Sequence, residues 1–187
     1  MPQLRSVVLV VMVLAATVWG ALVRTDDNDP RLQIAESVAA DFASLATETF
    51  DDFVAAAPGA ANCIGAPTLE ATEELDDLAT YDQPSVTIRV RVPATAPSLQ
   101  GSLTHELAHH VEVACASHLR LRPTFLAAQG HAPDTAWFGE GAWEDRPSEQ
   151  FAEAVVEVVL GRRSRNRLRL RLAPEAVEVV SDWLRLG

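Results

Sequence analysis

The 187-residue sequence contains no lysine, so its fifteen basic residues are all arginine. Aspartate and glutamate number 26, and the formal net charge at pH 7 is −11. Proteins that bind nucleic acid rely on basic groups that displace counterions from phosphates. This acidic sequence has no basic patch interleaved with aromatic residues. We therefore expect no nucleic acid among its partners.

Cysteine is scarce as well, with Cys63 and Cys115 as the only two. Only one pairing is open to them, and an oxidising compartment outside the cytoplasm allows it. We expect this disulfide to tie the loop around Cys63 to the end of a helix that carries Cys115. Two separate buried thiols are the alternative. Metal ligation by cysteine is disfavoured because no other candidate ligand stands at a suitable spacing.

Only one long hydrophobic run is present, and it is confined to the N-terminus. Residues 7–23 carry no charge and have an arginine on either side. A helix of this length rises about 25 Å, near the lower limit for crossing a bilayer. Residues 1–24 are therefore predicted to be a signal anchor or a signal peptide, with residues 25–187 as one domain outside the cytoplasm. Because Trp19 spoils the best cleavage position, an uncleaved membrane helix is preferred over secretion after cleavage. A buried core helix is disfavoured because the flanking charges suit export.

The rest of the chain predicts an α+β fold that is mainly helical, with a small sheet. Residues 86–92 alternate between β-branched and polar side chains and form the clearest strand, which we expect to be half-exposed. Proline positions and apolar spacing predict helices elsewhere. They are expected over residues 30–53, 69–78, 98–116, 123–130, 148–160 and 174–186, with an irregular segment over 130–145 and a basic, solvated face over 162–172.

The most informative motif is the run His-Glu-Leu-Ala-His at residues 105–109. Two histidines four positions apart on a helix stand one turn apart on the same face, so both imidazoles can bind one zinc ion. Glu106 then points into the same cleft without binding the metal, where it can take a proton from a zinc-bound water. Neither His110 nor His118 suits the same ion, and Glu112 is expected to be a surface carboxylate or an outer one.

A third ligand must come from elsewhere in the chain. The metzincin pattern requires glycine and histidine where this sequence has Glu112 and Cys115, so that pattern is excluded. The gluzincin pattern uses a glutamate on a later helix, followed four residues on by an acidic residue. Glu149 and Glu153 supply such a pair on one helix face, so that one can bind the metal while the other supports it. Acidic residues in the preceding loop are the alternatives: Glu140, Glu144 and Asp145.

These two segments together resemble the small gluzincins, including the catalytic domain of the anthrax lethal factor type. The resemblance rests on the motif at residues 105–109 and on the stretch Glu-Gln-Phe-Ala-Glu-Ala at residues 149–154. It implies a zincin-like domain in which the two helices pack together. It also implies a Zn²⁺ ion held by His105, His109 and Glu149, with Glu106 as the general base and Glu153 as the outer carboxylate.

One feature of that family is missing. Lethal-factor-like enzymes carry a tyrosine shortly before the ligating glutamate, and this tyrosine helps to stabilise the oxyanion. The corresponding segment here, residues 141–143, has none, and Tyr81, the only tyrosine, lies far upstream. His131 is therefore considered as the oxyanion partner, with a solvated loop histidine as the alternative.

The sequence predicts a zinc metallopeptidase that hydrolyses peptide bonds of a peptide or protein substrate outside the cytoplasm. The strand at residues 86–92 is expected to be the edge along which the substrate lies. The alternative is a membrane-anchored zinc-binding or interaction protein without catalysis. The absence of the tyrosine favours that alternative, whereas the presence of Glu106 argues against it because a structural zinc site needs no base.

Overall fold

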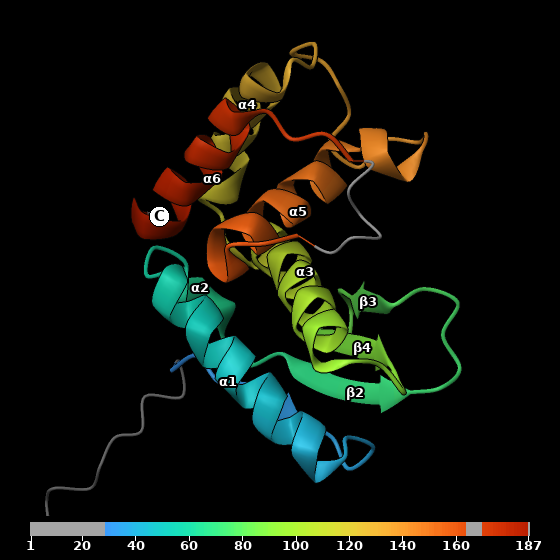
Figure 1. Cartoon of the computed structure of the whole chain (residues 1–187). Coiled ribbons are helices and arrows are strands. Elements are labelled where there is room, and N and C mark those ends of the chain that lie inside the picture. Colours follow the sequence, from blue (N-terminus) through green and yellow to red (C-terminus); the bar gives the residue numbers. More distant parts are fainter. Residues whose placement is uncertain (1–28, 164–169, 187) are drawn as a thin grey trace, which may run out of the picture.

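The fold combines helices with one small mixed sheet, as the sequence predicts for the α+β class (Figure 1). The computed structural model describes residues 29–163 and 170–186. In chain order the elements are β1 (Gln33–Ile34), α1 (Ala40–Ala56), α2 (Ala61–Ile64), β2 (Thr68–Thr72), β3 (Ala79–Asp82), β4 (Thr87–Arg91), α3 (Ala96–Ala114), α4 (His118–Gln129), a 3₁₀ turn (Trp143–Asp145), α5 (Pro147–Leu160) and α6 (Pro174–Leu186).

The sheet has the strand order β1-β2-β4-β3. The pairs β1–β2 and β2–β4 are parallel, whereas β3 runs antiparallel to β4. Strand β4 confirms the predicted strand, and its Ile88 and Val90 are buried. It is a central strand with a partner on each side, however, so the expectation that it forms the substrate-binding edge is wrong. The two edge strands of the sheet are β1 and β3, and β3 is the neighbour of β4.

Of the helices predicted in the N-terminal half, one begins later than expected and another is absent. Residues 31–35 pair with residues 65–69 in a parallel arrangement, through bonds such as Gln33 N to Pro67 O, and the helix begins only at Ala40. The second error concerns residues 69–78, where β2 and an irregular turn replace the expected helix. In both places, pairing with a distant strand outweighs the local preference for helix.

Helix α3 lies at the centre of the molecule (Figure 1). It packs against β3 and β4 on one side and against α1 and α5 on other sides. Helix α6 packs against both α5 and α4. Leu103, Leu107 and Val111 of α3 are fully buried, and Phe50, Phe53 and Phe151 pack in the same core. Almost the whole circumference of α3 is therefore in contact with protein. This burial fixes the orientation of the side chains at residues 105–109.

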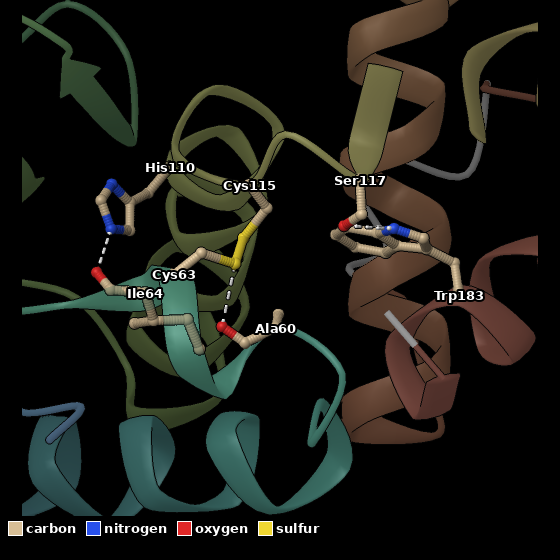
Figure 2. The surroundings of a disulfide bond; sticks show 7 residues. All are labelled: Ala60, Cys63, Ile64, His110, Cys115, Ser117 and Trp183. Atoms are coloured by element: carbon tan, nitrogen blue, oxygen red, sulfur yellow. Dashed lines mark hydrogen bonds between the residues drawn. A yellow bond between two sulfur atoms is a disulfide. The ribbon is translucent and has the colours of Figure 1, made fainter. Parts of the chain in front are cut away.

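The predicted disulfide is present and joins Cys63 in α2 to Cys115 at the end of α3, with a Cα–Cα distance of 5.2 Å (Figure 2). Within the described parts of the chain, no helix is long and apolar enough to cross a membrane. The hydrophobic run at residues 7–23 lies outside the described residues, as does most of the basic stretch after Gly161.

Candidate metal centre

Helix α3 positions the two motif histidines as the sequence predicts. His105 and His109 lie one turn apart, with ring centroids 4.8 Å apart and their Nε2 atoms at 3.2 Å. His105 is buried and His109 is partly exposed, so the pair sits at the boundary between the core and the surface. This placement gives the pair structural support from the core and access from solvent.

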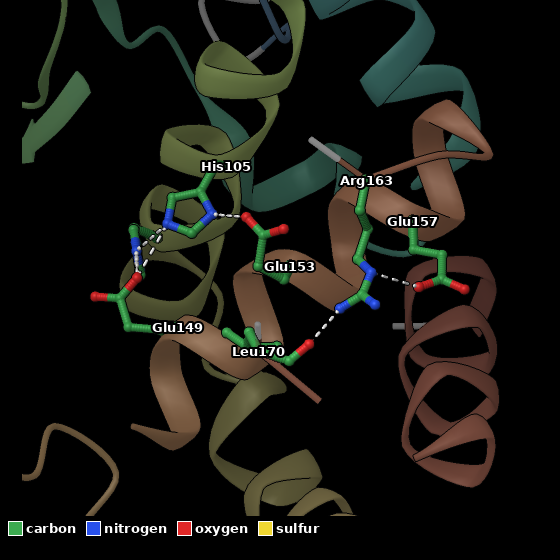
Figure 3. A network of polar contacts seen from close by, with 7 residues as sticks. His105, Glu149, Glu153, Glu157, Arg163 and Leu170 are labelled. Atoms are coloured by element: carbon green, nitrogen blue, oxygen red, sulfur yellow. Dashed lines mark hydrogen bonds and ion pairs between the residues drawn. The ribbon is translucent and has the colours of Figure 1, made fainter. Parts of the chain in front are cut away.

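Helix α5 brings the third group. Pro147 occupies its first turn, where the missing N–H costs no helical hydrogen bond, and Glu149 follows in the same turn. Glu149 Oε2 lies 3.0 Å from His105 Nε2 and 3.4 Å from His109 Nε2 (Figure 3). We call His105, His109 and Glu149 the metal group. Within the described residues it is the only set of three His, Cys, Asp or Glu side chains arranged so that it could hold an ion.

The distances within the metal group fit a small tetrahedral ion. Ligands about 2.0–2.1 Å from a tetrahedral centre are separated from one another by about 3.3 Å. Here the two distances between an imidazole nitrogen and the Glu149 oxygen are 3.0 and 3.4 Å, and the two imidazole nitrogens are 3.2 Å apart. Three protein donors also leave a fourth position for a water molecule or a substrate atom, as catalytic sites require.

The outer contact of His105 fixes which of its nitrogens faces the metal group. His105 Nδ1 lies 2.9 Å from Glu153 Oε1, and the carboxylate accepts the Nδ1 proton (Figure 3). A neutral imidazole then presents an unprotonated Nε2 to Glu149, whose carboxylate is also an acceptor. The repulsion between lone pairs that converge in this way is removed when a proton or a metal ion lies between them. Glu153 is thus positioned as the sequence predicts, behind a candidate ligand.

His109 has a carboxylate behind it as well. Its Nδ1 lies 3.5 Å from Oε1 of Glu112, which is buried rather than at the surface. Burial disfavours the charged imidazole, but the nearby carboxylates of Glu112 and Glu149 outweigh it and raise the pKa of His109 to about 10. Burial tends to raise the pKa of Glu149, yet His105 and His109 hold it well below its usual range. The two shifts report the same attraction between the imidazoles and the Glu149 carboxylate, and the carboxylates around His109 favour a positive charge at this place.

A cleft of about 650 Å³ opens over the metal group, and Glu106 lies in its lining beside His105 and His109. Aromatic side chains contribute another part of the wall. Phe138 is 62% exposed, and Trp143 stacks on His105 with ring centroids 6.0 Å apart. The cleft therefore combines a metal group, a carboxylate that does not belong to it, and apolar surface.

Strand β3 forms the opposite wall of the cleft. The bond from Arg91 N to Leu78 O shows that residues 78, 80 and 82 point their backbone groups toward β4. The backbone N–H and C=O groups of Ala79 and Tyr81 therefore point outward, and they form no backbone hydrogen bond on that side within the described residues. An extended chain could pair with these groups as an added strand.

Tyr81 is a residue of the cleft that the sequence did not lead us to expect. Its hydroxyl lies 2.8 Å from His110 Nδ1, and His110 Nε2 lies 2.6 Å from the Ile64 carbonyl (Figure 2). A carbonyl can only accept, so Nε2 carries the proton, and burial, which lowers the pKa of His110, keeps the ring neutral. The Tyr81 hydroxyl consequently donates to His110 Nδ1. His110 thus faces away from the metal group, as its position on the helix predicts.

The remaining candidates lie elsewhere. His131 Nε2 is 2.6 Å from Gln150 Oε1, and His131 is not part of the cleft lining. The structure therefore gives no support to His131 as the oxyanion partner. His118 is completely buried among aromatic rings, and none of the acidic residues at 140, 144 and 145 belongs to the metal group. Glu149 is the third member, as expected.

The sequence and the structure were also compared with known proteins. No protein-family model matches the chain, and no curated protein and no solved structure is detectably similar to it. The candidate function therefore rests on the metal group and the cleft alone.

Proposed function

We propose that this chain is a zinc-dependent peptidase with a zincin-like, gluzincin-type site. The observation that carries the proposal is the convergence of three acceptor atoms at 3.0–3.4 Å, with Glu106 beside them in an open cleft. Two imidazoles and one carboxylate are a donor set that catalytic zinc sites use, and oxygen-preferring ions such as Mg²⁺ and Ca²⁺ suit it poorly.

The roles of the residues follow from this assignment. The ion would be held by His105, His109 and Glu149. When bound, it would polarise the scissile carbonyl and lower the pKa of a water molecule. Glu106 accepts the proton of the attacking water and later delivers it to the departing amine. Glu153 holds the His105 ring in place by accepting its Nδ1 proton at 2.9 Å.

The substrate is proposed to be a polypeptide in an extended conformation. The outward backbone groups of Ala79 and Tyr81 are two residues apart, which is the spacing of main-chain pairing with an added strand. This assignment replaces β4 by β3 as the substrate-binding edge. The exposed ring of Phe138 offers apolar contact to a substrate side chain in the same cleft.

Tyr81 is proposed as the side chain that stabilises the transition state. It lines the cleft with Glu106, and its hydroxyl, which donates to His110 in the absence of substrate, would donate to the developing oxyanion instead. Tyr81→Phe is expected to lower kcat by about 10²-fold, with KM and zinc content unchanged. A full loss of zinc in this variant would contradict the assignment.

The proposed location is outside the cytoplasm, and the Cys63–Cys115 disulfide supports it because such bonds persist in oxidising compartments. Residues 1–24 remain assigned as a membrane anchor, or as a signal peptide that is removed. Expression of the full chain, followed by separation of membranes and sequencing of the mature N-terminus, distinguishes the two.

Metal analysis and a cleavage assay on matched variants test the function. We expect one zinc per chain in the wild type, loss of zinc and activity in His109→Ala, and retention of zinc in Glu106→Gln. Activity of Glu106→Gln on unfolded polypeptides should fall by about 10²–10⁴-fold, which is typical for removal of a general base.

The other outcomes have separate meanings. One zinc per chain without cleavage by the wild type would favour a catalytically inactive zinc-binding or interaction protein. If the wild type binds no zinc, both forms of the proposal fail.

A further inference from the structure

We propose that Glu112 positions His109 as Glu153 positions His105, so that the metal is held by two supported histidines. The inference deepens the proposed function and rests on its zinc site. Glu112 is not part of the motif at residues 105–109, and the sequence left open whether it lies at the surface.

The geometry around His109 supports this role. Its Nε2 belongs to the metal group, at 3.2 Å from His105 Nε2, so its Nδ1 faces the other way. Glu112 Oε1 lies 3.5 Å from that Nδ1, one helical turn later on α3. Carboxylates in this position fix the ring orientation of a metal-binding histidine and increase its basicity. At 3.5 Å the contact is longer than the 2.9 Å contact of His105 with Glu153, so its effect should be smaller.

The surroundings of Glu112 are mainly those of a buried group. Burial raises the pKa of its carboxyl group, and the neighbouring His109, Trp137 and Arg122 oppose only part of this shift. Arg122 itself stacks on the Trp137 ring, with its Cζ atom 5.0 Å from the ring centroid. His109 is therefore the ionisable neighbour whose distance to Glu112 supports a direct contact.

The cost of this residue to the metal-free fold argues that it serves the metal. The Glu112 side chain is 1% exposed, and neither of its oxygens makes a hydrogen bond within the described residues. A buried carboxylate in this state is expensive. Glu112 also stands in the last turn of α3, where the helix dipole disfavours negative charge. A residue with a purely structural role would be expected to stabilise the metal-free protein, whereas a buried carboxylate without a hydrogen-bond partner is expected to destabilise it.

The test separates metal affinity from stability. Zinc affinity of the full chain is measured by competition with a chromophoric chelator for the wild type, Glu112→Gln and Glu112→Leu. Thr49→Ala is the matched control, because Thr49 is a buried polar residue of a different helix, α1, and is not part of the metal group. We expect about tenfold weaker zinc binding in Glu112→Gln and at least as great a loss in Glu112→Leu. The control should bind as the wild type does.

Two further measurements exclude a merely structural effect. The unfolding midpoints of the metal-free variants at Glu112 should equal or exceed that of the metal-free wild type. The visible absorption spectrum of cobalt-loaded Glu112→Gln should differ from that of the wild type, because the spectrum reports ligand geometry. Zinc affinity of Glu112→Gln within twofold of the wild type, or a lower midpoint of its metal-free form, would overturn the inference alone. Absence of zinc binding in the wild type would overturn the proposed function and this inference together.

Discussion

Two regions of this molecule surround their histidines with contrasting chemistry. His105 and His109 face the carboxylates of Glu149, Glu153 and Glu112. The other group is an aromatic cluster around His118, whose ring centroid lies 4.5–5.6 Å from its nearest rings. The members of this aromatic cluster are His118, Phe125, Trp137, Phe151 and Trp183.

The charge that each group can carry follows from these neighbours. Nearby carboxylates overcome burial and raise the pKa of His109 to about 10. Burial, together with the nearby Arg122, lowers the pKa of His118 to about 3. Burial alone therefore does not decide how a histidine behaves. The surroundings of the first group favour a positive charge, whereas those of the second exclude charge and the His118 ring contributes packing.

The largest expected effect comes from opening the aromatic cluster. Phe151 is fully buried and contacts His118, Phe125, Trp137 and Trp183. Phe151→Ala removes these contacts and leaves a cavity, so we expect the free energy of unfolding to fall by about 3–5 kcal/mol. Urea denaturation of the metal-free protein measures it. Phe138→Ala is the matched control, since the Phe138 side chain is largely exposed, and its effect should stay within about 0.5 kcal/mol.

The metal group should respond to an ion as the aromatic cluster cannot. Free zinc at about one hundred times its dissociation constant should stabilise the folded wild type by about 2.7 kcal/mol. The measurement is the unfolding midpoint in titrated zinc, compared with the same titration of His109→Ala. An equal gain in both proteins would mean that zinc binds elsewhere.

The pH dependence of stability should reveal the lowered pKa of His118. Its pKa in the folded protein, about 3, lies below the value of about 6.5 expected for an unfolded chain. As the pH falls from 6.5, the unfolded chain takes up a proton that the folded protein refuses, so stability falls. Between pH 6.5 and 4.5 the loss from His118 should be about 2 kcal/mol. His109 does not obscure this window, because the stability from a raised pKa is fully present below 6.5.

His118→Phe keeps a ring in the aromatic cluster and removes the titrating group. Its unfolding free energy, measured by denaturant titration at both pH values, should fall by about 2 kcal/mol less than that of the wild type over this range. If the unfolding free energies of the two proteins changed equally between these pH values, the pKa of His118 would not be lowered in the folded protein. The contrast with His109 would then be lost.

The metal group could be read from the sequence because each of its parts is local. Residues 105 and 109 need only a helix to come together, and Pro147 marks the start of the helix that carries Glu149. The same holds for α6, whose predicted bounds agree with the structure. Periodicity of 3.6 residues and a first-turn proline do not depend on the rest of the chain.

The wall of the cleft could not be read in the same way, because it depends on distant pairing. The alternation of residues 86–92 would be the same in an edge strand and in a central strand. Residues 68–72 form β2 because they pair with β4, and that pairing cannot be predicted from the local sequence. Tyr81 lies far from the motif in sequence, and only the pairing of β3 with β4 brings it into the cleft beside α3. A pattern shows which face of a strand is buried but not which strand lies beside it.

The smallest expected effect concerns His131, which belongs to neither group of buried histidines. Its Nε2 contacts Gln150 Oε1 at 2.6 Å, and replacement by alanine removes one hydrogen bond, so the unfolding free energy should fall by about 1 kcal/mol. Zinc affinity and kcat should remain those of the wild type, because His131 neither lines the cleft nor contacts the metal group. Measurement of all three in His131→Ala, beside Tyr81→Phe, decides between the two residues. A fall in kcat for His131→Ala with zinc intact would return the oxyanion role to His131, and would mean that the loop bearing it moves toward the cleft when substrate binds.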